Sequence, residues 1–220
     1  MKKLTTAALA LSVLGSLPAY AVDVSANGGW SSEYIFRGAP QSDSSAFGGV
    51  DVEESGFYGG LWTADVEQGL EYDVYAGYSG EYEDFNYGVG FTLYLYTDDF
   101  DDDYQEINLS GGYGPFTVDV ALGEYDNFGG PAQDYTFVSL TGEYNGFYAV
   151  YGTFSQDFDG EYIEAGYGNS FSVQDTELFD YTFSIIHSTD DLLNDGDPTT
   201  SDEDTSLVFS VSKSFELFSN

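Results

Sequence analysis

The charged side chains of this chain are almost all carboxylates, with 39 Asp and Glu against four Lys and Arg. Arg37 is the one arginine, and Glu33 stands four residues before it. Side chains an even number of positions apart on a strand share a face, so an extended segment would place both on one side. A guanidinium among carboxylates can have two roles: Arg37 either selects solutes at a constriction or forms a structural ion pair. The sequence leaves both interpretations open.

Many of the acids alternate with apolar residues in runs that predict strands with one apolar and one polar face. In residues 85–97, every odd position up to 95 is apolar, and the first four even positions are small or polar. A charge that faces lipid at mid-depth costs several kcal/mol, so these acids belong inside a membrane barrel. The candidate pore-lining and constriction residues are therefore Arg37, Glu33, Glu71, Asp73, Glu106, Asp51, Asp119 and Asp180.

The predicted interior would favour cations over anions, because the field of a water-filled barrel follows its fixed charges. Nucleic acid is excluded as a partner, since its binding needs clustered Lys and Arg. The chain has no cysteine, which excludes disulfides, thiolate metal sites and cysteine nucleophiles. No resident cofactor is expected.

An acidic run contains the weak divalent-cation candidates Asp98, Asp99, Asp101, Asp102 and Asp103. Clustered carboxylates bind Ca²⁺ or Mg²⁺, but the run lacks the spacing of an EF-hand loop. We expect a solvated outer loop with at most loose divalent binding that bridges to lipopolysaccharide. The same expectation applies to residues 190–204.

His187 is the sole histidine, and Ser188 follows it. Some membrane barrels are lipid-modifying enzymes that use a Ser–His pair on the outer wall. Adjacent residues of a strand point to opposite faces, so Ser188 cannot serve as a nucleophile for His187. The sequence therefore favours a protein that is not an enzyme.

Turn signals recur at intervals of about 30 residues, near positions 55, 84, 114, 145 and 175. The intervening connections are looser and richer in Asp and Gly, an asymmetry that is typical of outer-membrane barrels. Twelve antiparallel strands are predicted, with ten as the alternative count. Their expected ranges are 22–37, 44–54, 57–66, 69–81, 85–97, 103–114, 115–124, 134–145, 146–156, 160–171, 177–189 and 205–215.

The chain opens with two lysines, an apolar run over residues 4–17 and an Ala-x-Ala site that ends at Ala21. This pattern predicts a secretory signal peptide over residues 1–21, followed by a single barrel domain over residues 22–220. Two lesser expectations follow from the strand pattern. Trp30 and Trp62 should lie in aromatic girdles. Phe215 should close the barrel ahead of a trailing tail, with Phe218 as the alternative closing aromatic.

Residues 32–38 read SEYIFRG, residues 56–62 read GFYGGLW and residues 70–78 read LEYDVYAGY. The first resembles the S-x-Y-x-F-R-G signature of the TorF porin family, also known as the Gcw_chp family, and the others resemble further segments of that family. The likeness covers residues 22 to about 125. It implies an outer-membrane barrel that is described as a porin by its architecture, without a substrate.

The sequence thus predicts an all-β, up-and-down transmembrane barrel in the outer membrane of a Gram-negative bacterium. The predicted function is passive diffusion of small solutes with a preference for cations. The partners would be outer-membrane lipids, lipopolysaccharide and the solutes themselves. The alternatives are a closed structural or adhesive barrel with acidic surface loops, and a soluble β-sandwich whose acidic face meets water.

Overall fold

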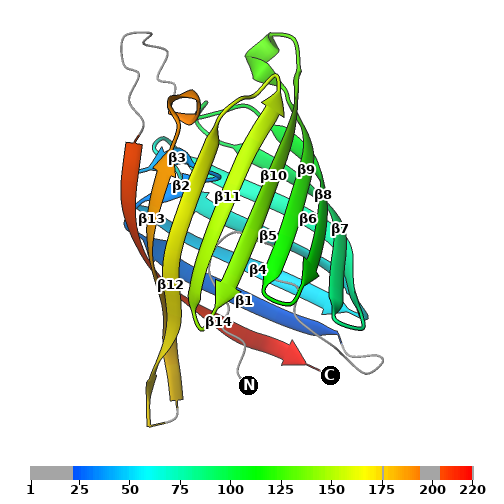
Figure 1. The fold of residues 1–220 in the computed structure, drawn as a ribbon, viewed down its shortest axis with the longest axis vertical. Helices are drawn as coiled ribbons and strands as arrows, with labels where there is room; N and C mark the ends of the chain where they lie inside the picture. Colours follow the sequence, from blue (N-terminus) through cyan, green and yellow to red (C-terminus); the bar gives the residue numbers. More distant parts are fainter. Residues whose placement is uncertain (1–21, 175, 194–203, 220) are drawn as a thin grey trace.

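The computed structural model describes residues 22–174, 176–193 and 204–219. Twelve antiparallel strands form a closed barrel in the order β1-β14-β13-β12-β11-β10-β9-β8-β7-β6-β5-β4 (Figure 1). The two remaining strands, β2 and β3, pair only with each other. The strands are β1 Asp23–Ser31, β2 Tyr34–Phe36, β3 Ala39–Ser42, β4 Ser45–Glu54, β5 Phe57–Asp65, β6 Leu70–Tyr82, β7 Phe85–Tyr96, β8 Tyr104–Tyr113, β9 Phe116–Tyr125, β10 Gln133–Tyr144, β11 Phe147–Gln156, β12 Glu161–Val173, β13 Thr176–Ser188 and β14 Asp204–Ser219.

The connections differ at the two ends of the barrel, which we name the turn end and the loop end. At the turn end, two-residue turns such as Ser55-Gly56 and Asn145-Gly146 place both residues at positive φ, as twisted hairpins require. At the loop end, the links are longer, and two short 3₁₀ helices, Asn127–Gly129 and Asp190–Leu192, lie in them. β1 begins and β14 finishes at the turn end (Figure 1). The predicted strand count and asymmetry are therefore confirmed.

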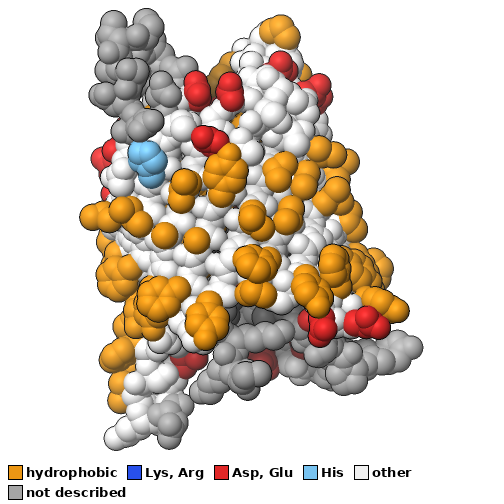
Figure 2. All heavy atoms as spheres, viewed as in Figure 1, with side chains coloured by type: hydrophobic (Ala, Val, Ile, Leu, Met, Phe, Trp, Pro, Cys, Tyr) orange, Lys and Arg blue, Asp and Glu red, His pale blue; other side chains and the backbone are white. Residues whose placement is uncertain are grey.

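The outer wall is apolar, as the alternation predicts. Val50, Leu61 and Ile107 are each more than two-fifths exposed, and Figure 2 shows such side chains across the middle of the wall. Exposed aromatic residues gather beside the turns, where Phe85 and Tyr113 pair at 6.3 Å between ring centroids. This arrangement matches the apolar band and aromatic girdle of a membrane-spanning barrel. Within the described ranges, no helix is long and apolar enough to cross a membrane.

The last strand departs from the sequence-based prediction. β14 runs to Ser219, which faces Asp23, and Phe218 faces Val24. The register shifts by one residue next to Val24, so Leu217 is left without a partner across the pair. Such a bulge lets a strand continue pairing after an irregularity. The prediction that Phe215 ends the barrel is therefore wrong, because residues 216–219 complete the pairing with β1. The proposed signal peptide, residues 1–21, lies outside the described residues.

Candidate functional site

The segment between β1 and β4 forms a hairpin that lies inside the barrel (Figure 1). β1 ends at Ser31 instead of continuing to residue 37, and β2 and β3 pair around a turn made by Arg37 and Gly38. Both turn residues have positive φ, 50° and 85°, which is the pattern of a type I′ turn. We call residues 32–44 the inward hairpin.

Arg37, at the tip of this hairpin, forms an ion pair with Glu106 of β8. Its Nη1 donates to Glu106 Oε1 at 2.5 Å and its Nη2 donates to Oε2 at 3.1 Å. The guanidinium carbon also lies 4.3 Å from the ring centroid of Phe137 on β10. A bidentate pair of this kind fixes orientation as well as adding energy. The tip is therefore held at a defined place in the interior.

Glu106 is the most heavily hydrogen-bonded carboxylate of the interior. Besides Arg37, it accepts hydrogen bonds from Tyr94 Oη at 3.0 Å, Tyr135 Oη at 2.7 Å and Asn108 Nδ2 at 2.8 Å. It is 1 % exposed. A buried carboxylate needs such compensation, because burial removes its hydration. The pocket that receives Arg37 is thus built from β7, β8 and β10 together.

The body of the hairpin contacts β5 and β6, the strands that follow β7 around the barrel. Tyr34 Oη donates to Glu71 Oε1 of β6 at 3.0 Å, and its ring meets Trp62 of β5 edge-on at 5.8 Å. Beyond the tip, Ser188 Oγ of β13 donates to the carbonyl oxygen of Gly38 at 2.7 Å. Since its contacts reach β5 and β6 on one side and β13 on another, the hairpin crosses the interior near the loop end.

The structure corrects two predicted positions and supports the inward orientation of six others. Arg37 and Glu33 are not on the barrel wall, because the chain leaves β1 after Ser31 and turns inward. The six acids predicted on strands occupy the inward-facing parity: Glu71, Asp73, Glu106, Asp51, Asp119 and Asp180. Arg37 and Glu106 are brought together as expected, although Arg37 reaches Glu106 from the hairpin rather than from a neighbouring strand.

Asp51 and Asp180 lie away from the hairpin tip and have their own partners, whereas Asp119 lies close enough to the tip for the charge of Arg37 to act on it. Asp51 accepts hydrogen bonds from Asn27 Nδ2 at 3.2 Å and from the Tyr75 hydroxyl. Asp180 accepts one from Ser170 Oγ at 2.5 Å, and Asp119 faces Ser139 across the β9–β10 pair. These residues lie in the middle and turn-end parts of the interior. Asp51 and Asp180 therefore form an acidic region separate from Arg37.

A model of the Gcw_chp family, described as a bacterial protein of unknown function, matches residues 16–179. The chain belongs to the Gcw_chp family. No curated protein matches its sequence. The inward hairpin of this Gcw_chp chain contains the SEYIFRG segment, so Tyr34, Arg37 and Gly38 of that signature are the residues that dock it.

Solved structures share the barrel fold with this Gcw_chp chain. One is described as "Unveiling the Mechanism Behind the in-meso Crystallization of Membrane Proteins" and has a TM-score of 0.57 at 10% sequence identity. The match covers 89% of this chain and 84% of the solved chain. Two porins are less similar. Pseudomonas aeruginosa OccK1 (OpdK) has a TM-score of 0.39 at 16% identity over 81% of this chain. A BenF-like porin from Pseudomonas fluorescens Pf-5 has 0.40 at 12% over 88%. This chain spans 59% and 64% of those porins.

Aromatic residues of the interior were missed by the sequence interpretation. Trp62 is 8 % exposed and lies inside, against Tyr34 and Phe47, so its assignment to a girdle is wrong. The signal was present, because Trp62 stands on the parity opposite to the outward-facing Phe57 and Leu61. Trp30, by contrast, is 40 % exposed on the outer wall near the loop end, as a girdle residue would be.

The acidic connection between β7 and β8 is tied to the barrel rim. Asp101 accepts hydrogen bonds from Tyr104 Oη and Tyr125 Oη, each at 2.8 Å, and Asp102 accepts one from the amide of Phe128. Burial, with the nearby charges of Asp102 and Asp126, raises the pKa of Asp103 above its usual value. Within the described ranges, no three His, Asp or Glu side chains converge as a metal site. Loose Ca²⁺ or Mg²⁺ binding at this loop stays a prediction.

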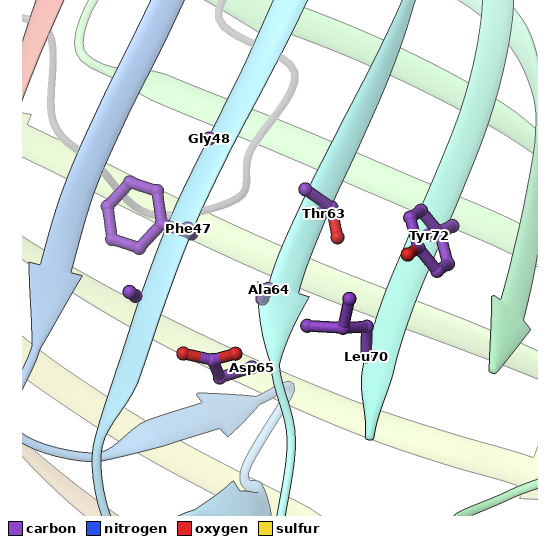
Figure 3. Close-up of a pocket in the computed structure, with 8 residues that line it drawn as sticks. Phe47, Gly48, Thr63, Ala64, Asp65, Leu70 and Tyr72 are labelled. Atoms are coloured by element: carbon purple, nitrogen blue, oxygen red, sulfur yellow. The ribbon is translucent and has the colours of Figure 1, made fainter. Parts of the chain in front are cut away.

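His187 and Ser188 point to opposite faces, as predicted. His187 Nδ1 lies 2.9 Å from Thr205 Oγ1 on the outer wall, whereas Ser188 is buried inside against Gly38. They therefore form no Ser–His pair. A hollow of about 260 Å³ lies on the wall over β4, β5 and β6 (Figure 3). Asp65 is the one carboxylate among its largely apolar lining residues.

Proposed function

We propose that this protein is a narrow outer-membrane channel for the passive diffusion of small solutes, with a preference for cations. The observation that carries the proposal is the separation of chemistry between the two faces of the barrel. The outer wall is apolar, and the interior holds carboxylates with Arg37 already paired to Glu106. Such a barrel is stable in a bilayer and surrounds a polar path.

The asymmetry of the ends sets the orientation that we propose. Short turns face the periplasm in outer-membrane barrels, and longer loops face outward. The turn end, with both chain ends of the barrel, would then be periplasmic. The acidic loops would face lipopolysaccharide.

The inward hairpin is the proposed constriction. It crosses the interior at the level of Glu71 and Glu106, and the ion pair at its tip fixes its position. Below it, Asp51 and Asp180 lie in a region without a cation, because Lys213, the other cation of the described chain, is on the outer wall. The fixed charge of that region would raise the local concentration of cations.

The proposal is tested by conductance of the refolded protein in planar bilayers under a KCl gradient. We expect small steps whose reversal potential has the sign of cation selectivity. A reversal potential with the sign of anion selectivity would contradict the proposed role of the acids. Silence in repeated reconstitutions of folded protein would contradict the channel itself.

A second function, a closed barrel with acidic surface loops as its working part, is favoured by one observation. Stacked aromatic rings occupy the loop end together with the hairpin, including Tyr104 on Tyr125 at 4.4 Å and Tyr135 on Phe158 at 4.7 Å. Side chains packed in this way reduce the space for solutes. Silent reconstitutions, combined with exclusion of small sugars from proteoliposomes, would favour this alternative.

A further inference from the structure

Two buried carboxylates beneath the inward hairpin lack the compensation that Glu106 has. Glu71 and Asp73 stand two positions apart on β6, point to the same inner face, and are 1 % and 2 % exposed. Side chains two positions apart on a strand are neighbours on one face, so the two carboxyl groups lie side by side. Neither Glu71 Oε2 nor Asp73 Oδ1 has a hydrogen-bond donor.

A carboxylate pair with this geometry needs positive charge. A carboxylate has no proton to donate, so two ionised groups side by side on a buried face repel each other. Either one proton is shared between them or a cation lies against both. Tyr34 satisfies only Glu71 Oε1, which leaves Glu71 Oε2 and Asp73 Oδ1 buried without a partner.

The surrounding charges favour a divalent cation over a single proton. Asp101 adds a further acid to the electrostatic environment of the pair, whereas the charge of Glu106 is met by Arg37. Arg37 is the nearby cation, and both of its donating nitrogens are bound to Glu106. A shared proton would therefore leave most of the local negative charge uncompensated, whereas a divalent ion would neutralise both carboxylates.

We propose that Glu71 and Asp73 form a binding site for a divalent cation of the Ca²⁺ or Mg²⁺ class at the inner wall under the hairpin. Hard divalent ions prefer carboxylate oxygens, and Mg²⁺ in particular is often held by one or two carboxylates with waters completing the shell. Glu71 Oε2 and Asp73 Oδ1 would be the protein ligands. This site is distinct from the acidic loop of residues 98–103, and the inference does not depend on whether the barrel conducts.

The position of the site links ion binding to the hairpin. Tyr34 of β2 donates to the same carboxylate that would hold the ion, and Trp62 of β5 faces Asp73 in the neighbouring strand. An ion that orders Glu71 would therefore also stabilise the docked position of Tyr34. Trp62 emission should report binding directly.

The experiment uses the full folded barrel in detergent, with Trp30→Phe so that Trp62 is the remaining tryptophan. Trp62 emission and the thermal unfolding midpoint are followed as CaCl₂ or MgCl₂ is added at constant ionic strength, after treatment with a chelator. We expect both readouts to change saturably with at least one of the ions, since a ligand that binds only the folded state raises its stability. Glu71→Gln/Asp73→Asn should lose the response or weaken its half-saturation by about tenfold or more.

Asp102→Asn/Asp103→Asn is the matched control, because it removes two carboxylates from the loop and leaves Asp101 and the pair intact. It should keep the Trp62 response. If the double variant of the pair does not refold, Glu71→Gln is tested alone, because the amide oxygen of the new side chain can still accept the hydrogen bond from Tyr34. If the parent protein does not respond to either ion, the proposed site is wrong and a shared proton is favoured. If only the loop variant loses the response, the ion binds at the loop and not at Glu71 and Asp73.

Discussion

Arg37 and Glu106 are 69 residues apart in the chain, yet two hydrogen bonds join them across the barrel interior. The contact is made because the chain leaves the barrel wall after Ser31 and turns back at Gly38. The single arginine of the chain thereby holds the element that crosses the lumen. The width of the proposed pore therefore depends on the position of the Arg37 side chain.

Arg37→Ala should destabilise the folded barrel by about 3–5 kcal/mol, because it leaves the buried carboxylate of Glu106 without its charge partner. Arg37→Ala/Glu106→Gln should be less destabilised than Arg37→Ala alone, since the unpaired charge is removed as well. Denaturant unfolding in detergent, read by tryptophan emission, measures both. Lys213→Ala, which removes the cation on the outer wall, is the control for charge. A double variant no more stable than Arg37→Ala would show that the loss does not come from an unpaired charge on Glu106.

Gly38→Ala should loosen the docked hairpin. A Cβ at this position would approach Tyr162 Cβ to 2.7 Å, and the residue has a φ of +85°. We expect a loss of about 1–3 kcal/mol, measured as above. Gly129→Ala is the matched control, because Gly129 also has positive φ but nothing would lie within 4 Å of its Cβ. Equal losses for the two variants would mean that crowding against β12 plays no part.

Quenchers that reside in the bilayer should reduce the emission of Trp30 much more than that of Trp62. Trp62→Phe leaves Trp30, which faces outward, so brominated lipids should quench its emission strongly. Trp30→Phe leaves Trp62, which packs against Tyr34 inside, and the same lipids should quench it weakly. Comparable quenching of both would contradict the assigned faces of β1 and β5.

Neutralising the acids of the turn-end interior should reduce cation selectivity. Asp51→Asn/Asp180→Asn removes two inward charges, so the reversal potential under a KCl gradient should move toward zero. Asp65→Asn removes a charge from the outward-facing parity and should leave the reversal potential unchanged. A shift of the same size in both variants would indicate that the general charge of the protein sets selectivity.

The barrel could be predicted from the sequence because its determinants are local and repeated. Alternation with a period of two assigns each strand a lipid face, and turn pairs such as Asn145-Gly146 mark the hairpins. The inward orientation of Glu71 and Glu106 followed from the same parity. These features do not depend on contacts between distant segments.

The inward hairpin could not be predicted in the same way. Residues 34–36 are aromatic or β-branched, as strand residues often are, and Arg37-Gly38 is a weaker turn signal than Asn-Gly. What bends the chain inward is the set of partners in the wall, such as Glu106 for Arg37 and Trp62 for Tyr34. These partners lie tens of residues away from the hairpin in the sequence, and no local sequence pattern predicts the contacts. The bulge that extends β14 past Phe215 likewise depends on pairing with β1.

Removal of the hairpin tests the central claim, that a conducting barrel is narrowed by this element. Ser31 and Ser45 face each other on β1 and β4, so an Asn-Gly turn can replace residues 32–44 and keep the β1–β4 pairing in register, at the cost of the hydrogen bonds between Ser32 and Phe209 of β14. Single-channel conductance in KCl is measured for this variant and for the parent protein, each first shown to be folded. We predict small steps for the parent and clearly larger ones for the variant. No conductance from either protein, or equal conductance from both, would contradict the account.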